Sequence, residues 1–147
     1  MKKQKSKFAK VLIANRGEIA LRAVKTARKL GLQSVAIYSK VDKSSQHVTQ
    51  ADEAICIGPA PSSKSYLVKN AIIHTALELS CDAIYPGYGF LSENAEFVDL
   101  CEANDIKFIG PAAESIRKMG DKSTARELAI TNNVPVVPGS DRAYDSR

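Results

Sequence analysis

Short apolar runs alternate with longer amphipathic segments along most of the chain, and this alternation predicts its secondary structure. Five runs, each short and bounded by turn-forming residues, are expected to be strands at residues 10–14, 34–39, 54–57, 83–85 and 107–109. The segments between them carry apolar residues at helical spacing. This order of elements predicts an α/β fold, a Rossmann-like open parallel sheet with helices on both faces.

The amphipathic segments and their flanking residues place the expected helices. The first ends before Gly31, which suits a left-handed C-terminal cap, and its apolar stripe comprises Ile19, Ala20, Ala23, Val24, Ala27 and Leu30. A second helix is expected at about residues 67–79 with the serines at 62, 63 and 65 available as N-caps, and a third from 92 or 93 to about 103. A short helix after Gly110 and Pro111 stops at Gly120, and a last one, capped by Asp121, reaches about residue 132.

One domain is expected at residues 10–133, flanked by two segments of different character. Residues 1–9 form a basic tail of the kind that is usually disordered. Residues 134–147 begin with prolines, each of which fixes φ and disfavours helix in the preceding residue, and they end in a polar stretch. We expect an extended linker there, leading toward a domain that these residues do not include.

The net charge of +5 on the 147 residues is concentrated in the first ten residues. Its five charges lie on Lys2, Lys3, Lys5, Lys7 and Lys10, so the other 16 basic residues balance the 16 acidic ones. A basic stripe that could bind a nucleic-acid backbone is therefore not expected in the body of the domain.

Other features of composition narrow the class of protein. No apolar run exceeds four residues, whereas a membrane-spanning helix needs about 20, so no membrane association is expected. The apolar run that follows the tail is too short for a signal peptide. Cys56, Cys81 and Cys101 lie in apolar stretches without a Cys-x-x-Cys pair, which predicts reduced core residues of a cytoplasmic protein.

The most unusual stretch is PGYGFLSEN at residues 86–94. It follows the fourth expected strand at the end where open parallel sheets bind ligands. Two glycines let the backbone turn sharply and present Tyr88 outward with its hydroxyl free to bond, and a helix beginning at Ser92 or Glu93 would point its amides into the same region. The alternative is a glycine turn with Tyr88 packed on the edge of the sheet.

Two helix starts bear on phosphate binding. The turn at residues 14–18 lies where a dinucleotide-binding loop would lie, but a single Gly17 and the acidic Glu18 favour a plain strand-to-helix turn. Lys122 begins the last helix, where a cation opposes the helix dipole. Either an anion binds beside this lysine or its position is chance.

The sequence holds no complete catalytic constellation. His47 and His74 are too few, and too distant from the cysteines, to predict a zinc site. A nucleophile elbow, a His-Glu-x-x-His helix and a Walker loop are all absent from the sequence.

Nearly the whole chain, from about residue 10 to 141, resembles the amino-terminal domain of biotin carboxylase. The order and spacing of the matching strings make the resemblance specific: IANRGEIALR at 13–22, ADE at 51–53, IGPAPS at 57–62, KSYL at 64–67, PGYGFLSEN at 86–94, FIGP at 108–111 and MGDK at 119–122.

The resemblance implies an ATP-grasp ligase, in which ATP and bicarbonate form carboxyphosphate and CO₂ passes to biotin on a carrier protein. In this family the amino-terminal domain forms one wall of the active site. The resemblance assigns Lys122 to ATP phosphate, Tyr88 and the backbone of Gly89 to biotin, and Glu93 to the magnesium–phosphate region. Tyr88 and Lys122 are then expected to face a common cleft.

The resemblance also implies partners. These are the biotin carboxyl carrier protein, the carboxyltransferase subunits and a second copy of the chain, held through the first helix, although Lys25 and Lys29 depart from the mixed charge expected there. The parent enzyme is expected to be an acetyl-CoA carboxylase of fatty acid biosynthesis. A pyruvate, propionyl-CoA or methylcrotonyl-CoA carboxylase, or a non-catalytic dimerisation or docking module, remains an alternative. The family's glycine-rich lid and metal-holding glutamates are not in these residues, so the chain by itself is expected to be inactive.

Overall fold

The apolar runs form a five-stranded parallel sheet in a computed structural model that describes residues 8–137. The strands are β1 (Lys10–Ile13), β2 (Gln33–Ser39), β3 (Glu53–Gly58), β4 (Ala83–Tyr85) and β5 (Lys107–Phe108). Their order is β3-β2-β1-β4-β5, so β1 is central and pairs in parallel with both β2 and β4. The predicted α/β class with an open parallel sheet is confirmed.

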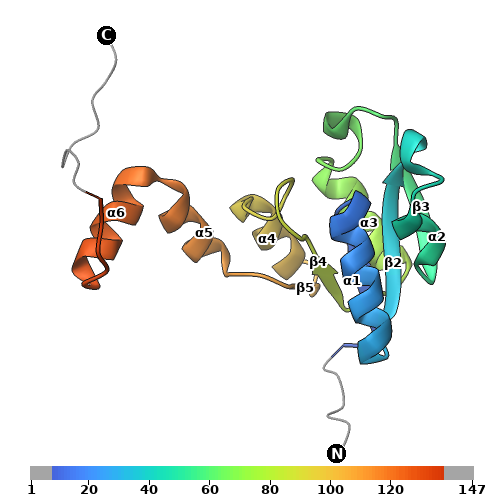
Figure 1. Ribbon diagram of the computed structural model, residues 1–147, viewed down its shortest axis with the longest axis horizontal. Helices are drawn as coiled ribbons and strands as arrows, with labels where there is room; N and C mark the ends of the chain where they lie inside the picture. The colour runs from blue at the N-terminus through green and yellow to red at the C-terminus, as the bar shows by residue number, and fades with distance from the viewer. Residues whose placement is uncertain (1–7, 138–147) are drawn as a thin grey trace, which may run out of the picture.

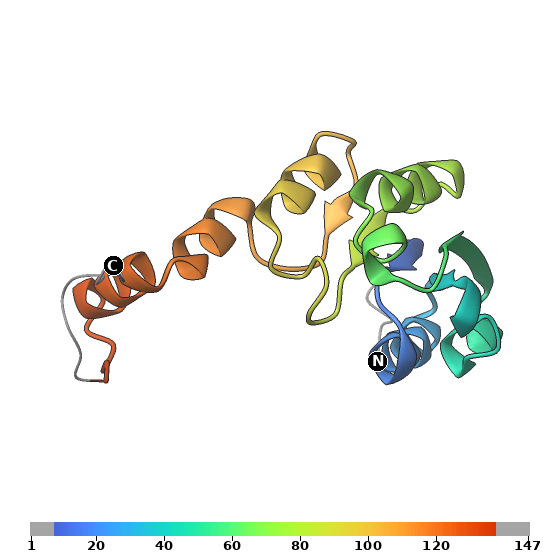
Figure 2. The ribbon, with the colours of Figure 1, turned by 90° about the horizontal axis from the view of Figure 1, so that it is seen from above.

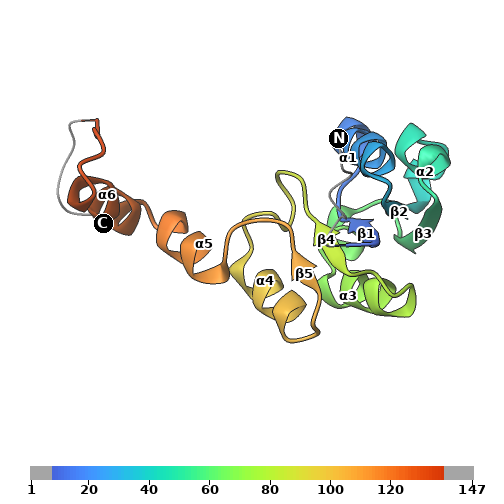
Figure 3. The same ribbon diagram turned by 90° about the horizontal axis from the view of Figure 1, so that it is seen from below.

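Helices cover both faces of the sheet, as predicted. Figures 2 and 3 show α1 (Gly17–Leu30) and α2 (Gln46–Gln50) on one face, and α3 (Lys69–Glu78) and α4 (Ala95–Glu102) on the other. Two short 3₁₀ turns, η1 (Lys40–Asp42) and η2 (Ser62–Lys64), lie in the connections on either side of β3. Neither these turns nor α2 was predicted from the sequence.

Alternation along β1 divides the core between the two faces. Leu12 points into the larger apolar cluster beneath α3 and α4, whereas Val11 and Ile13 point toward α1. Small buried residues of α1, among them Ala20 and Ala27, pack against that side. The expected stripe of α1 is confirmed except at its end, because the Leu30 side chain is exposed.

Two helices begin later than the sequence predicted. Of the serines expected to cap α3, Ser62 and Ser63 lie in η2 and Ser65 follows it, and α3 begins at Lys69 without a side-chain cap. The helix expected from residue 92 or 93 begins at Ala95, because the side chain of Asn94 accepts the hydrogen bond from the Phe97 amide at 2.9 Å. The helix N-terminus expected at Ser92 or Glu93 therefore lies at Ala95 instead.

Two of the three cysteines are buried. Cys81 and Cys101 are buried as predicted, and burial raises the pKa of their thiols to about 11 and about 12. The prediction was wrong for Cys56, which is exposed. It lies on β3, an edge strand that is paired on one side only.

After β5 the chain leaves the sheet. Figure 1 shows α5 (Ala113–Gly120) and α6 (Lys122–Thr131) as an arm that extends sideways, and α6 buries none of its residues. Asp121 caps α6 as predicted, since its Oδ1 accepts from the Thr124 amide at 2.7 Å. Residues 134–137 have no helix or strand, and the rest of the expected linker lies outside the described residues.

The chain is ordered slightly before the predicted start of the domain. Phe8 packs against the α1 side of the core, and the Ala9 amide donates to Asp82 Oδ2 at 2.8 Å. The remainder of the expected tail, residues 1–7, lies outside the described residues. Within residues 8–137, no helix combines the length and the apolar character that crossing a bilayer requires.

Candidate functional site

Two connections meet at the carboxyl ends of neighbouring strands. Because β1 and β4 are paired in parallel, the turn after β1 and the loop after β4 leave the same edge of the sheet. The Ala14 amide extends this pairing by one residue, donating to the Tyr85 carbonyl at 2.8 Å. The candidate site therefore forms between the turn at residues 14–18 and the loop at residues 86–90.

Asn15 joins the turn to the loop. Its side chain is 1% exposed, and its Nδ2 donates to the carbonyls of Pro86 at 2.7 Å and Tyr88 at 3.0 Å. Its Oδ1 accepts from the Arg16 amide at 2.9 Å. The turn is thus a strand-to-helix turn, as favoured from the sequence, but it also holds the neighbouring loop.

Tyr88 projects from the loop as predicted, with 59% of its surface exposed. Its hydroxyl is not free, which corrects the sequence expectation: it donates to Glu18 Oε1 at 2.9 Å. The same hydrogen bond raises the pKa of the Tyr88 phenol. Gly89 is exposed beside it with φ +70°, and its backbone is open to solvent.

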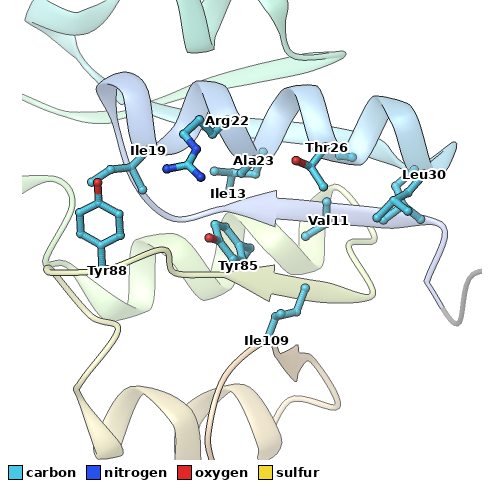
Figure 4. A pocket seen from close by; sticks show the side chains of 12 residues that line it. Val11, Ile13, Ile19, Arg22, Ala23, Thr26, Leu30, Tyr85, Tyr88 and Ile109 are labelled. Carbon is cyan, nitrogen blue, oxygen red and sulfur yellow. The ribbon is translucent and has the colours of Figure 1, made fainter.

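Two hollows meet at Tyr88. A smaller one of about 470 Å³ is lined by the turn and the loop: Asn15, Arg16, Gly17, Glu18, Ile19, Tyr88, Gly89 and Phe90. A larger one of about 520 Å³ is a groove between α1 and the sheet, with mostly apolar walls. Figure 4 shows Tyr88 and Leu30 at opposite ends of this groove, with Arg22 near the Tyr88 end. A ligand with a flat apolar body and a polar edge would find both kinds of contact around Tyr88.

Arg16 contacts the end of the loop at Phe90. Its guanidinium lies over the rings of Tyr66 and Phe90, 5.6 and 5.5 Å from their centroids, and these two rings stack at 5.2 Å. The buried Tyr66 hydroxyl donates to Asp42 Oδ2 at 2.6 Å and accepts from the Ser39 amide at 3.0 Å. This network anchors Phe90, and with it the far end of the loop.

The same network shifts two pKa values. Burial, and then the hydrogen bond to Asp42, raises the pKa of Tyr66 to about 12. Burial acts to raise the pKa of the Asp42 carboxyl, but hydrogen bonds from Ser39 and Tyr66 together with the Arg16 charge hold it below its usual value. Tyr66 therefore stays a neutral donor and Asp42 a charged acceptor at neutral pH.

Glu93 does not form a metal site by itself. It is exposed and does not line either hollow at Tyr88. Among residues 8–137 no three His, Cys, Asp or Glu side chains lie close enough together to hold a metal ion. The described residues therefore do not fit a magnesium centre of their own.

Lys122 lies apart from Tyr88. It is exposed in the first turn of α6, the helix that follows α5 in the arm of Figure 1, and it lines neither hollow at Tyr88. The cleft expected to join the two residues is not formed by these hollows. The Asp121 carboxylate caps this helix start, so the cation beside it does not by itself indicate a bound anion.

Four residues of the site were not predicted as site residues: Asn15, Arg16, Glu18 and Tyr66. The sequence could have indicated Asn15, because a polar residue directly after a buried strand predicts a hydrogen-bond partner. That partner could not be named from the sequence, since it is 71 residues away.

Comparison with known proteins shows that the chain is similar to one part of several longer proteins. The family model of the biotin carboxylase N-terminal domain matches residues 7–116. Chloroplastic biotin carboxylase 2 of Populus trichocarpa is 56% identical over 137 residues, which cover 93% of this chain and 26% of that protein. The mitochondrial methylcrotonoyl-CoA carboxylase subunit alpha of Mus musculus is 57% identical over 132 residues, covering 90% and 18%.

A solved structure agrees with these relatives. The biotin carboxylase domain dimer of Hydrogenobacter thermophilus 2-oxoglutarate carboxylase, in complex with MgADP, ADP and bicarbonate, is 49% identical with a TM-score of 0.87. The similarity covers 91% of this chain and 29% of that one. This chain therefore spans less than a third of the length of each of these relatives.

Proposed function

The chain belongs to the family of biotin carboxylase N-terminal domains, and we propose that it supplies one wall of the site where biotin is carboxylated. The full reaction uses ATP and bicarbonate and loads CO₂ onto biotin carried by another protein. Relatives of this chain include biotin carboxylases and the biotin-dependent carboxylases that contain them, which are ligases.

The observation that carries the proposal is the exposed ring of Tyr88, held between two hollows at the carboxyl ends of β1 and β4. Biotin has a fused bicyclic body with a polar ureido edge. Tyr88 offers that body a flat aromatic face, and the exposed backbone of Gly89 offers the edge hydrogen-bonding groups. Both residues lie within the PGYGFLSEN string, which is long enough to be specific.

The nucleotide would lie at some distance from the Tyr88 ring, toward the arm. We assign Lys122 to an ATP phosphate, because its ammonium is exposed at the start of α6 and has no ion pair among residues 8–137. Glu93 would contribute at most one carboxylate to a magnesium ion held mainly by phosphates and water. Since the residues described here do not fit a magnesium site of their own, we derive no step from it.

The chain by itself should not turn over. Phosphoryl transfer depends on positioned metal ions and on charged groups around the transferred phosphate. Tyr88, Gly89 and Lys122 supply biotin and phosphate contacts only, and the arm would have to meet further protein before a nucleotide is enclosed.

The same proposal implies protein partners and a parent enzyme complex. We infer that the chain works with a biotin carboxyl carrier protein and carboxyltransferase subunits in a cytoplasmic acetyl-CoA carboxylase. A homodimer through α1 would have to accommodate four exposed cations on that helix: Arg22, Lys25, Arg28 and Lys29. A non-catalytic docking module is the second candidate, favoured by the arm, whose Met119 and Ile130 side chains are exposed apolar surface.

Complementation tests the proposal. The chain is mixed with a biotin carboxylase relative from which the matching segment has been removed, and bicarbonate-dependent ATP hydrolysis is measured with free biotin. We expect neither part to be active alone, the mixture to be active, and Tyr88→Ala to reduce turnover through a higher KM for biotin. Turnover by this chain alone, or an equally active Tyr88→Ala mixture, would contradict the proposal. A mixture that associates without activity would favour the docking module.

A further inference from the structure

The loop at residues 86–90 cannot hold its own conformation. Three of its residues have left-handed backbone, Gly87 and Gly89 with φ +68° and +70° and Phe90 with φ 44°. Such torsions are unfavourable for a residue with a side chain, so Phe90 must be held by its surroundings. The Gly89 carbonyl accepts from the Ser92 amide at 2.9 Å, which closes a turn at the end of the loop but leaves the other loop residues without such a bond. The fixed place of Tyr88 therefore depends on contacts from outside the loop.

Asn15 supplies the contacts to the backbone. Both hydrogens of its buried Nδ2 are used, one on the Pro86 carbonyl and one on the Tyr88 carbonyl, which brackets Gly87. The two segments are so close that a Cβ at Gly87 would lie 2.9 Å from that nitrogen.

Two further residues of the same turn hold the remaining parts of the loop. Glu18 accepts from the Tyr88 hydroxyl at 2.9 Å, which fixes the outer end of the ring. Arg16 lies over Phe90 and fixes the end of the loop nearest α4. The backbone, the ring and the loop end are each held by a different residue of one short turn.

We propose that the turn 15–18, which lacks the glycines of a phosphate loop, is the positioning element of the Tyr88 loop, and that Asn15 is the residue on which this depends. The turn fixes the loop backbone and the tyrosine ring before a ligand binds, so that binding does not have to order the loop. The inference deepens the proposed function and rests on it only for the identity of the ligand, since the holding contacts exist without one.

The first experiment needs no ligand. In ¹⁵N-labelled chain, the backbone order parameters at Gly87 and Gly89 are compared with those of Asn15→Asp, which keeps the side-chain volume but has no hydrogen to donate. The matched control is Asn104→Asp, because Asn104 Nδ2 donates to the Leu100 carbonyl, at the end of α4 and away from this loop. We expect values to fall from about 0.85 to below about 0.6 in Asn15→Asp and to stay unchanged in the control.

Glu18→Ala is a second variant that does not depend on a buried substitution, because Glu18 is exposed. It should free the Tyr88 ring, seen in the relaxation of its aromatic carbons, while Glu18→Gln keeps an acceptor oxygen and should restore the order. Unchanged loop order in Asn15→Asp would overturn the inference, and so would loss of loop order in the Asn104 control. If Asn15→Asp does not fold, an unchanged Tyr88 ring in Glu18→Ala would overturn it.

The second experiment uses free biotin as the probe, titrated while the amides of Tyr88 and Gly89 are followed. We expect Asn15→Asp to weaken binding about tenfold and Glu18→Gln to stay within about twofold, a pattern that a purely structural role would not produce. Equal binding by the wild-type chain and by Asn15→Asp would contradict positioning. If the loop loses order in Asn15→Asp but biotin shifts no loop amide in the wild type, the positioning role stands and the biotin site proposed above fails.

Discussion

Replacing Gly87 with alanine should destabilise the chain more than the same change at Gly89. The two glycines have nearly the same backbone, with φ +68° and +70°. A Cβ at Gly87 would lie 2.7 Å from Ile19 Cγ2 and 2.9 Å from Asn15 Nδ2, whereas a Cβ at Gly89 would meet nothing within 4 Å. The pair therefore shares the cost of a left-handed alanine and differs in the steric contact alone.

The expected magnitudes follow from these geometries. Left-handed backbone costs an alanine about 1–2 kcal/mol, and the lower entropy of its unfolded chain returns about 0.4–1 kcal/mol of that. Gly89→Ala should thus lower the free energy of unfolding by about 1 kcal/mol. At Gly87 the contacts below 3 Å add about 1–3 kcal/mol, because either Ile19 or the Asn15 amide must move. We expect a total loss of about 2–4 kcal/mol there.

Urea unfolding followed by far-ultraviolet circular dichroism measures both variants. The midpoints should separate while the slope stays constant, because neither change alters the surface exposed on unfolding. Gly31→Ala, another left-handed glycine with no heavy atom near its Cβ, provides a second control and should match Gly89→Ala. Equal losses at Gly87 and Gly89 would refute the close approach of the loop to Asn15.

Two further predictions concern groups outside the site. Of the three cysteines, only Cys56 should react with a thiol reagent in the folded chain, because Cys81 and Cys101 are buried with pKa values of about 11 and about 12. All three should react after unfolding, and rapid labelling of three thiols in the native chain would contradict the burial. Burial lowers the pKa of His47, so the unfolded chain binds a proton that the folded chain does not, and the free energy of unfolding should fall as the pH drops below about 6.5. His47→Leu should make the free energy of unfolding less dependent on pH in this range, whereas His74→Leu, at an exposed position, should leave the dependence as it is. A free energy of unfolding that does not change with pH in the unchanged chain would refute the prediction.

The sheet could be predicted because its central strands, β1 and β2, are almost entirely buried. Runs such as residues 10–14 and 34–39 are apolar and bounded by turn-forming residues, and their period leaves few alternatives. Helix starts were less secure, because several residues near each start can act as a cap. Asn94 competes with Ser92 before α4, and only the tertiary position of the loop decides between them.

The candidate site was predictable only in part. Gly87 and Gly89 allowed a sharp turn with Tyr88 pointing outward, but the sequence left packing on the edge of the sheet as an alternative. The role of the turn was hidden, because Asn15 and Glu18 reach Tyr88 across 73 and 70 residues of sequence. Such contacts require the strand order β1–β4, which no local pattern contains. The assignment of Lys122 to phosphate stays a prediction, because the cap that Asp121 provides accounts for the helix start without an anion and does not test what the ammonium binds.

If the proposed biotin site is correct, the turn at residues 15–18 acts on biotin through Tyr88. A double-mutant cycle in the complemented mixture tests it most directly: kcat/KM for free biotin is measured with Asn15→Asp, Tyr88→Ala and both together. We expect Asn15→Asp to lower kcat/KM about tenfold when Tyr88 is present and to have almost no effect once the ring has been removed. Effects that multiply, with the same tenfold loss in both backgrounds, would contradict it.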